Sequence, residues 1–314
     1  PHSSVWPLTS TSSITIGRRC ECMVVEGFSP VLKPMIKYRG GKSRELSHLL
    51  EWVPDTFDRY IEPFFGGGAL YFALAPDNAV INDLNARLMS FYDDVADRYD
   101  RMRAELDEIE SAYESNRHDY EALKQMHPDD RVPDANEALY YSMRAQFNGL
   151  ESTSLLAGTL YYYINKTAYS GMIRYNSNGE FNVPYGRYKH FNTRVITEKH
   201  SALLQSATRM NTDFENVLAE CSPDDFVFLD PPYDSPFSDY GNEETKDGFS
   251  ENDHRRLAEL FFALPCKALL VIGSTPLTES LYGTHVVSRY SKSYAVNIRN
   301  RFKANSEHIL VTNK

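Results

Sequence analysis

The residues with the clearest chemical potential are Asp230, Pro231, Pro232 and Tyr233, which directly follow the apolar run at 226–229. The run predicts a buried strand, and open α/β sheets bind ligands beyond the carboxyl ends of their strands. A carboxylate and a rigid proline carbonyl can accept both N–H bonds of an exocyclic base amine, and an aromatic ring can stack on the base. The carboxylate can also take the proton that the amine releases on alkylation. This order predicts catalysis on a nucleobase amine. The alternative is a turn that ends a strand, with a core tyrosine.

A glycine turn and a second acid lie upstream of this motif. Residues 58–65 predict a strand running into Gly66–Gly68, a helix is expected at 69–74, and a second strand at 79–81 ends near Asp83. This order opens a doubly wound parallel sheet. Glycine lets a ligand approach the backbone closely, and the acid can accept hydrogen bonds from ribose hydroxyls. The pattern suits a nucleoside without a pyrophosphate, such as S-adenosyl-methionine; a plain tight turn with a capping aspartate is the alternative.

Two other glycine-loop interpretations fail on spacing. KYRGGKS at 37–43 would need glycine at position 36 to bind phosphates as an ATPase loop, and Ile36 stands there. FFGGGALY at 64–71 would need a small residue at position 71 to bind a dinucleotide. Tyr71 would obstruct the close packing of helix and strand in that motif.

The rest of the chain completes an interrupted α/β pattern. Apolar runs at 226–229, 268–272 and 308–312 predict further strands of the same sheet. Residues 87–146 have helical spacing, whereas 160–195 lack it and predict hairpins and loops. We therefore expect an α/β fold, a Rossmann-like doubly wound sheet with an inserted helical and hairpin target-recognition domain.

The expected boundaries follow from the same pattern. Residues 1–34 predict a flexible N-terminal extension. Residues 35–86 and 195–314 are expected to form the catalytic, cofactor-binding domain, and 87–194 the target-recognition insert. The aromatic run at 161–163 is expected in the core.

Composition limits the class of protein. The chain has 314 residues with 42% hydrophobic and 24% charged side chains, which is typical of a globular protein. No apolar run approaches the ~20 residues of a membrane helix, and no secretory signal opens the sequence. The four cysteines and nine histidines lack zinc-ligand spacing. We expect a cytoplasmic protein with reduced thiols, no metal site and no membrane segment.

Charge is unevenly distributed. The net charge is −10, but residues 36–44 hold four basic residues and no acid, and 286–303 hold five and none. Residues 165–209 hold seven basic and two acidic residues. A basic face on an acidic body can bind nucleic-acid phosphates, although chance basic stretches are the alternative.

Five segments in order resemble the Dam-type (alpha group) DNA adenine-N6 methyltransferases: KYRGGK (37–42), EPFFGGGAL (62–70), INDLN (81–85), the block at 165–188 and DPPY (230–233). The densest similarity is INKTAYSGMIRYNSNGEFNVPYGRYK at 164–189, which contains the RYN, GEFNVP and GRY elements of that family. The resemblance covers nearly all of 35–314. It implies a bacterial or phage-encoded enzyme that flips adenine out of GATC in duplex DNA and methylates N6 with S-adenosyl-methionine as cofactor. We expect it to work as a monomer.

The resemblance also implies roles for individual residues. The catalytic set is Asp230, Pro231, Pro232 and Tyr233. The cofactor set is Tyr38, Lys42, Pro63, Phe64, Gly66, Gly68, Asp83 and Asp230, in which Lys42 meets the cofactor carboxylate and Asp83 the ribose. The DNA-reading set is Lys37, Tyr169, Arg174, Asn176, Pro184, Arg187 and Tyr188, in which Tyr169 enters the base stack. Arginine suits guanine O6 and N7, and Pro184 suits a thymine methyl.

Some alternatives stay open. The same chemistry could act on an RNA adenine or on cytosine N4, and a catalytically silent DNA-binding module could retain the fold. Glutamine methylation in proteins is disfavoured, because that family resemblance would place Asn at position 230. The sequence departs from the family at Tyr38, Ser170 and Met172, where tryptophan, asparagine and leucine are common.

Overall fold

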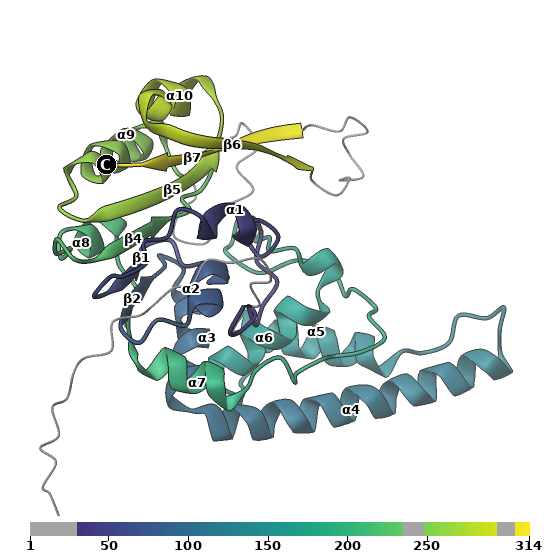
Figure 1. The fold of residues 1–314 in the computed structure, drawn as a ribbon. Coiled ribbons are helices and arrows are strands. Elements are labelled where there is room, and N and C mark those ends of the chain that lie inside the picture. Colours follow the sequence, from purple (N-terminus) through teal and green to yellow (C-terminus); the bar gives the residue numbers. More distant parts are fainter. Residues whose placement is uncertain (1–29, 235–247, 294–304) are drawn as a thin grey trace, which may run out of the picture.

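The strands of the described residues form one seven-stranded sheet in the order β3-β2-β1-β4-β5-β7-β6 (Figure 1). This computed structural model describes residues 30–234, 248–293 and 305–314. The strands are β1 (Tyr60–Glu62), β2 (Ala79–Asn82), β3 (Ala207–Met210), β4 (Phe226–Leu229), β5 (Lys267–Gly273), β6 (Val286–Ser293) and β7 (Asn305–Thr312). β1 to β5 are parallel, and β7 lies antiparallel to β5 and β6. The predicted α/β, Rossmann-like fold is confirmed.

Both faces of the sheet are buried. Successive side chains of a strand point to opposite faces, so Phe226 and Phe228 enter one apolar cluster and Val227 and Leu229 the other. The helices are α1 (Leu46–Leu50), α2 (Ala69–Leu74), α3 (Ala86–Asp97), α4 (Tyr99–Met126), α5 (Ala135–Phe147), α6 (Ala157–Thr167), α7 (Glu198–Gln205), α8 (Phe214–Leu218), α9 (Glu251–Ala263) and α10 (Pro276–Tyr282). The first cluster contains residues of α1 to α7, and the second contains residues of α8 to α10. Burial on both sides explains why the central strands are continuously apolar.

Helices α4 and α5 support the recognition block, which we define as residues 168–188. α4 is 28 residues long, and its C-terminal end projects away from the sheet (Figure 1). The Tyr113 hydroxyl lies 2.6 Å from the Tyr185 hydroxyl and donates to the carbonyl of Tyr188. The Tyr140 hydroxyl on α5 donates to the carbonyl of Val183 at 2.8 Å. Buried tyrosines therefore fix the backbone of the block from beneath.

The recognition block is a hairpin, as its sequence predicts, but the helix before it was not expected. Antiparallel bridges join Ala168 to Tyr185 and Tyr175 to Phe181. The prediction of hairpins and loops from 160 onward is wrong as far as Thr167, because α6 continues to that residue. Residues 158–165 are buried all round, so the sequence has no amphipathic period that would mark a helix. The aromatic run at 161–163 is buried in the core, as predicted.

Among the other elements, some were predicted correctly and some were missed. The predicted helix at 69–74 and strand at 226–229 coincide with α2 and β4. Strands β3 and β6 had no counterpart in the sequence analysis. Within the expected N-terminal extension, residues 1–29 lie outside the described residues, and the amides of Val31 and Leu32 donate to the carbonyls of Ala73 and Phe72. Among the described residues, no helix is long and apolar enough to cross a membrane.

Candidate active site

One cavity of about 540 Å³ opens at the carboxyl ends of β1, β2 and β4, and both Asp83 and Asp230 line it. β1 pairs with β2 on one side and with β4 on the other, so the residues that follow these three parallel strands meet at one edge. Every residue of the predicted cofactor and catalytic sets lines this cavity. The structure therefore brings these two predicted sets together, although 188 positions separate Lys42 from Asp230.

The side chains of Lys42 and Asp230 form a tight ion pair. The Lys42 ammonium donates to both carboxylate oxygens at 2.6 Å and to the carbonyl of Gly40 at 2.9 Å. The Lys42 side chain is 3% exposed and that of Asp230 is 20% exposed. A carboxylate has about four lone-pair positions, so Asp230 keeps acceptor capacity toward the cavity. The contact of Lys42 with a cofactor carboxylate stays a prediction, and its ion pair with Asp230 was not foreseen.

The ring of Tyr233 is held from two sides. The Lys42 ammonium lies 5.1 Å from the ring centroid, and the His308 imidazole on β7 packs edge-on at 5.1 Å. Glu45 fixes His308, because its Oε2 lies 2.9 Å from Nδ1 and also accepts the Tyr290 hydroxyl at 2.6 Å. These two contacts hold the Tyr233 ring in one orientation at the cavity wall.

The glycine turn packs against Tyr38. Gly66 has φ +48°, and a Cβ added there would lie 2.8 Å from the Tyr38 ring. Gly68 has φ +62°, and its Cβ would lie 2.5 Å from the ring of Phe65. Both positions therefore require glycine, for backbone conformation and for space. Burial raises the pKa of the Tyr38 hydroxyl well above its usual value, with the charge of Asp83 adding to the effect.

Asp83 is oriented by the backbone. The amide of Gly66 donates to one carboxylate oxygen at 2.8 Å, and the amide of Asn85 donates to the other at 2.9 Å. These bonds tie the end of β2 to the glycine turn after β1 and hold the carboxylate at the cavity wall. A carboxylate oxygen has about two lone-pair positions, so an oxygen that accepts a backbone amide can also accept a hydrogen bond from a ligand hydroxyl.

An aromatic wall of the cavity was only partly foreseen. Phe64, which was predicted, packs against Phe214 at a centroid distance of 5.3 Å and against Phe249 at 5.8 Å. Phe214 and Phe249 were missed. Phe214 begins α8 after Asp213, an aspartate–phenylalanine pair at the end of β3, and this pair could have been noticed had β3 been recognised.

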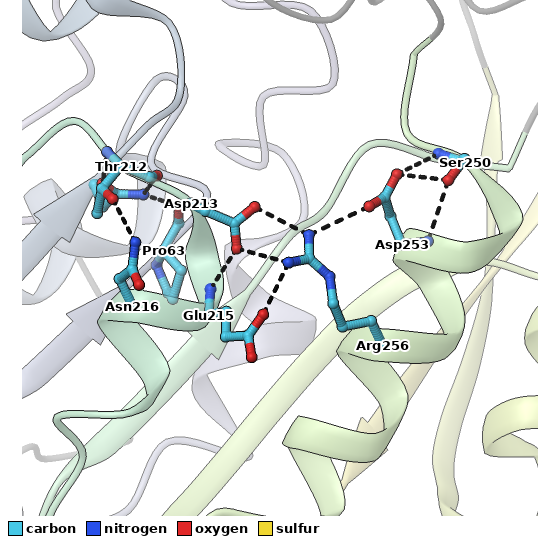
Figure 2. Close-up of polar contacts among 9 residues, drawn as sticks. Pro63, Thr212, Asp213, Glu215, Asn216, Ser250, Asp253 and Arg256 are labelled. Carbon is cyan, nitrogen blue, oxygen red and sulfur yellow. Dashed lines mark hydrogen bonds and ion pairs between the residues drawn. The ribbon is translucent and has the colours of Figure 1, made fainter.

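Arg256 on α9 braces this wall. Figure 2 shows its guanidinium between the carboxylates of Asp213, Glu215 and Asp253. It contacts both oxygens of Asp213, at 3.1 and 3.0 Å, and its central carbon lies 4.4 Å from the ring centroid of Phe214. α9 is thereby joined to the loop after β3.

Glu62 is a second buried acid that the sequence analysis left without a role. It ends β1, lines the cavity, is 2% exposed, and accepts the Tyr60 hydroxyl at 2.8 Å. Burial raises the pKa of Glu62 well above its ordinary value, and the nearby charge of Asp230 adds to this effect. Glu62 is therefore a candidate hydrogen-bond donor inside the cavity.

The predicted DNA-reading residues lie outside the cavity, with the exception of Lys37. All of them belong to the recognition block or to the loop beside it: Lys37, Tyr169, Arg174, Asn176, Pro184, Arg187 and Tyr188. Tyr169 is 45% exposed, and its amide donates to the carbonyl of Pro184 at 2.9 Å. Pro184 is exposed at the surface of the hairpin. Their predicted roles are not tested by this placement.

The polar side chains of the block bind one another or the side chain of Glu137 on α5. Arg174 donates from Nε to the side chain of Asn182 at 2.7 Å. Arg187, at φ +53°, donates to both carboxylate oxygens of Glu137 at 3.0 Å. The Asn176 amide donates to Glu180 at 2.8 Å. These groups would have to exchange partners to read a base.

Comparison with known proteins identifies relatives over most of the chain. The family model of the D12 class N6 adenine-specific DNA methyltransferases matches residues 38–298. The chain is 31% identical over 294 residues to the Type II methyltransferase M.CviBI of Paramecium bursaria Chlorella virus NC1A, covering 90% of this chain and 100% of that relative. It is 31% identical over 304 residues to the Type II methyltransferase M1.LlaDCHI of Lactococcus lactis subsp. cremoris, covering 90% and 95%. It is 30% identical over 273 residues to the Retron Ec67 DNA adenine methylase of Escherichia coli, covering 84% and 86%.

Proposed function

Because this chain belongs to the D12 class of N6 adenine-specific DNA methyltransferases, we propose that it methylates adenine N6 in GATC sequences of duplex DNA, using S-adenosyl-methionine and flipping the base. The prediction of an adenine-specific DNA methyltransferase is confirmed at the level of the family. The main support for this more specific proposal is that Asp83, the glycine turn and Asp230 line one cavity at one edge of the sheet.

The residues of the cavity fit S-adenosyl-methionine. Its volume of about 540 Å³ lies within the usual range for sites of this size of ligand. Asp83 offers acceptors to ribose hydroxyls, and the rings of Phe64 and Phe214 offer an apolar surface to adenine. Lys42 offers a buried ammonium to the methionine carboxylate, while remaining close to Asp230. When bound, the cofactor supplies a methyl group on a positively charged sulfur.

Asp230 and Pro231 would activate the target amine. The lone pair of an exocyclic amine is delocalised into the ring, so the nitrogen must be drawn toward tetrahedral geometry before it can attack. The Asp230 carboxylate accepts one N–H and the Pro231 carbonyl accepts the other. As the new bond forms, Asp230 takes the proton from N6. Pro232 stiffens the loop, and Tyr233, held by His308, stacks on the flipped adenine.

The recognition block would read the duplex around the target. Arg174, Arg187 and Lys37 supply donors that suit guanine O6 and N7, and exposed Pro184 suits a thymine methyl. Exposed Tyr169 would fill the space that the flipped adenine leaves. In this proposal the target-recognition insert is 87–194, the catalytic parts are 35–86 and 195–314, and a single chain suffices for the reaction.

Transfer of tritiated methyl groups to defined duplexes tests the proposal. A duplex with one GATC site should accept label that digests to N6-methyladenine. A duplex in which the adenines of both strands of that site are already methylated should accept none. Label in cytosine, or transfer to RNA in preference to duplex DNA, would reject the proposed substrate.

Asp230→Ala tests the catalytic assignment. We expect it to reduce kcat by at least ~10³-fold, because the variant loses both the acceptor and the base. Asp77→Ala is the matched control, because Asp77 is exposed and lies just before the amino end of β2, away from the cavity, so this variant should retain most activity. Near-normal methylation by a folded Asp230→Ala variant would contradict the assignment of Asp230.

A further inference from the structure

Lys37 and Tyr38 are adjacent in sequence but contact different parts of the molecule. The Lys37 side chain turns toward the recognition block, where its ammonium lies 4.3 Å from the ring centroid of Tyr188. It also lies against Gly171, since a Cβ added there would come within 2.9 Å of Lys37 Cδ. One residue of this dipeptide therefore contacts the segment proposed to read DNA.

Tyr38 turns the other way, toward the glycine turn of the cavity. A Cβ added at Gly66 would lie 2.8 Å from its ring, and one added at Gly67 would lie 3.1 Å from its Cβ. Tyr38 also lines the cavity. The backbone between these two side chains is therefore a direct link between the recognition block and the cofactor loop.

Asn165 on α6 fixes that link. Its Oδ1 accepts the backbone N–H of Lys37 at 2.9 Å, and its Nδ2 donates to the backbone carbonyl of the same residue at 2.7 Å. Asn165 is 6% exposed. Lys37 lies in no strand or helix, so neither backbone group has a partner from regular secondary structure. A side-chain amide holds a donor and an acceptor side by side in one plane, and Asn165 uses both.

Resting on the proposed function, we propose that Asn165 is a positioning residue that sets the Lys37–Tyr38 backbone for both cofactor binding and DNA recognition. Asn165 is not among the residues that line the cavity. Because one pair of hydrogen bonds supports both side chains, occupancy of the cavity and binding of the target duplex become energetically coupled, and each ligand favours the other by the same factor.

Asn165→Leu removes both hydrogen bonds and keeps the branched shape of the side chain. The affinity of the full-length variant should be measured for the non-transferring analogue sinefungin and for a GATC duplex. We expect each Kd to rise by about tenfold, as for loss of one to two hydrogen bonds of net stabilising value. The ratio of duplex affinities with and without sinefungin should fall toward one. Asn165→Asp, which keeps the acceptor but loses the donor, should have an intermediate effect on both Kd values.

Double-mutant cycles separate positioning from general damage to the fold. In a Lys37→Ala background, Asn165→Leu should cost little further duplex affinity. In a Tyr38→Ala background it should cost little further sinefungin affinity. Asn313→Leu is the matched control. Its amide makes the same kind of bonds, to the amide of Ala268 and the carbonyl of Cys266, at the opposite end of β5 from the cavity. It should lower Tm without changing either Kd.

The outcomes are distinct. Additive effects in both cycles, or an unchanged sinefungin ratio in Asn165→Leu, would overturn the positioning role while leaving the proposed function intact. A wild-type protein that binds neither sinefungin nor the duplex would overturn the proposed function and this inference together. Non-additive losses in both cycles, with the Asn313→Leu values unchanged, would support it.

Discussion

The cavity rim and the recognition block hold their polar side chains in different ways. At the rim, Asp230 and Lys42 are paired in a largely buried position, and Asp83 is oriented by two backbone amides. In the block, Arg174 and Arg187 are exposed and bind neighbouring side chains, Asn182 and Glu137. The rim is assembled by strands from distant parts of the chain, whereas most of the block comes from one continuous segment.

The polar groups of the rim are therefore held in place, whereas those of the block can exchange their partners. Buried charges are costly to leave unpaired, so a change at the rim should affect both turnover and stability. Exposed ion pairs contribute little to stability, so the arginines of the block can leave their partners for a base at small cost. Substitutions in the two regions should therefore produce different combinations of kcat, Kd and Tm.

After Asp230→Ala, the largest effect is expected at the rim, from Lys42→Met. The variant leaves the Asp230 carboxylate without its ammonium and takes a cation from the cavity. We expect kcat to fall about 10²–10³-fold, and the free energy of unfolding to fall by roughly 1–3 kcal/mol, since Asp230 is partly exposed. Single-turnover methyl transfer and urea unfolding measure the two effects. Lys199→Met, at an exposed position of α7, is the control. Near-normal turnover by Lys42→Met would show that catalysis does not depend on the Lys42–Asp230 ion pair.

The next effect belongs to the block. Arg174→Ala removes an exposed guanidinium that is bonded to Asn182. The Kd for a GATC duplex should rise by about 10–100-fold, while Tm should hardly change. Fluorescence anisotropy on duplexes with single-base changes identifies the base pair concerned. Arg255→Ala on α9 should leave every Kd as it is. Equal weakening on all duplexes would instead indicate a phosphate contact.

A smaller effect concerns Lys166, which precedes the recognition block. Burial lowers the pKa of Lys166 to about 8, with the charge of Lys37 adding to the effect. The unfolded chain keeps this proton up to about pH 10.5, whereas the folded protein releases it near pH 8, so wild-type stability should rise between these values.

Lys166→Met should therefore stabilise the protein by roughly 1–2 kcal/mol at pH 7. The gain should shrink as pH approaches 10. Thermal unfolding at pH 7 and pH 10 measures it, with Lys199→Met as the exposed control. A gain that is the same at both pH values would show that lost charge burial is not its cause.

The smallest effect is expected from Glu137→Gln, which weakens the partner of Arg187. We expect duplex affinity to increase by about threefold, because an exposed ion pair of this kind contributes under ~1 kcal/mol. Discrimination between duplexes should decrease slightly, since Arg187 is then less well oriented. Titration of the variant with each duplex, at two salt concentrations, measures both the affinity and the discrimination between duplexes. Weaker binding to every duplex would mean that Glu137 orients Arg187 more than it restrains it.

The elements predicted correctly are those whose signals are local. α2 lies between glycines and a turn, and β4 is continuously apolar. The first and last residues of both elements could therefore be predicted from the sequence. β3 was missed because its last three residues are exposed or only partly buried and include Arg209. Its pairing with β2 makes it a strand. The glycine turn, Asp83 and the four residues after β4 were also local signals. Phe249 and Glu62 acquired significance only once the cavity was defined.

The sequence by itself determined the chemistry available to this protein: which strands end in acids, which turn needs glycine and which segment carries the donors for bases. Only the tertiary structure decided that Lys42 pairs with Asp230, that His308 supports Tyr233, and that Asn165 binds the backbone of Lys37. The reason is physical. Strand and turn preferences depend on neighbours along the chain, whereas these contacts depend on strand order and helix packing, which bring together residues over 70 positions apart.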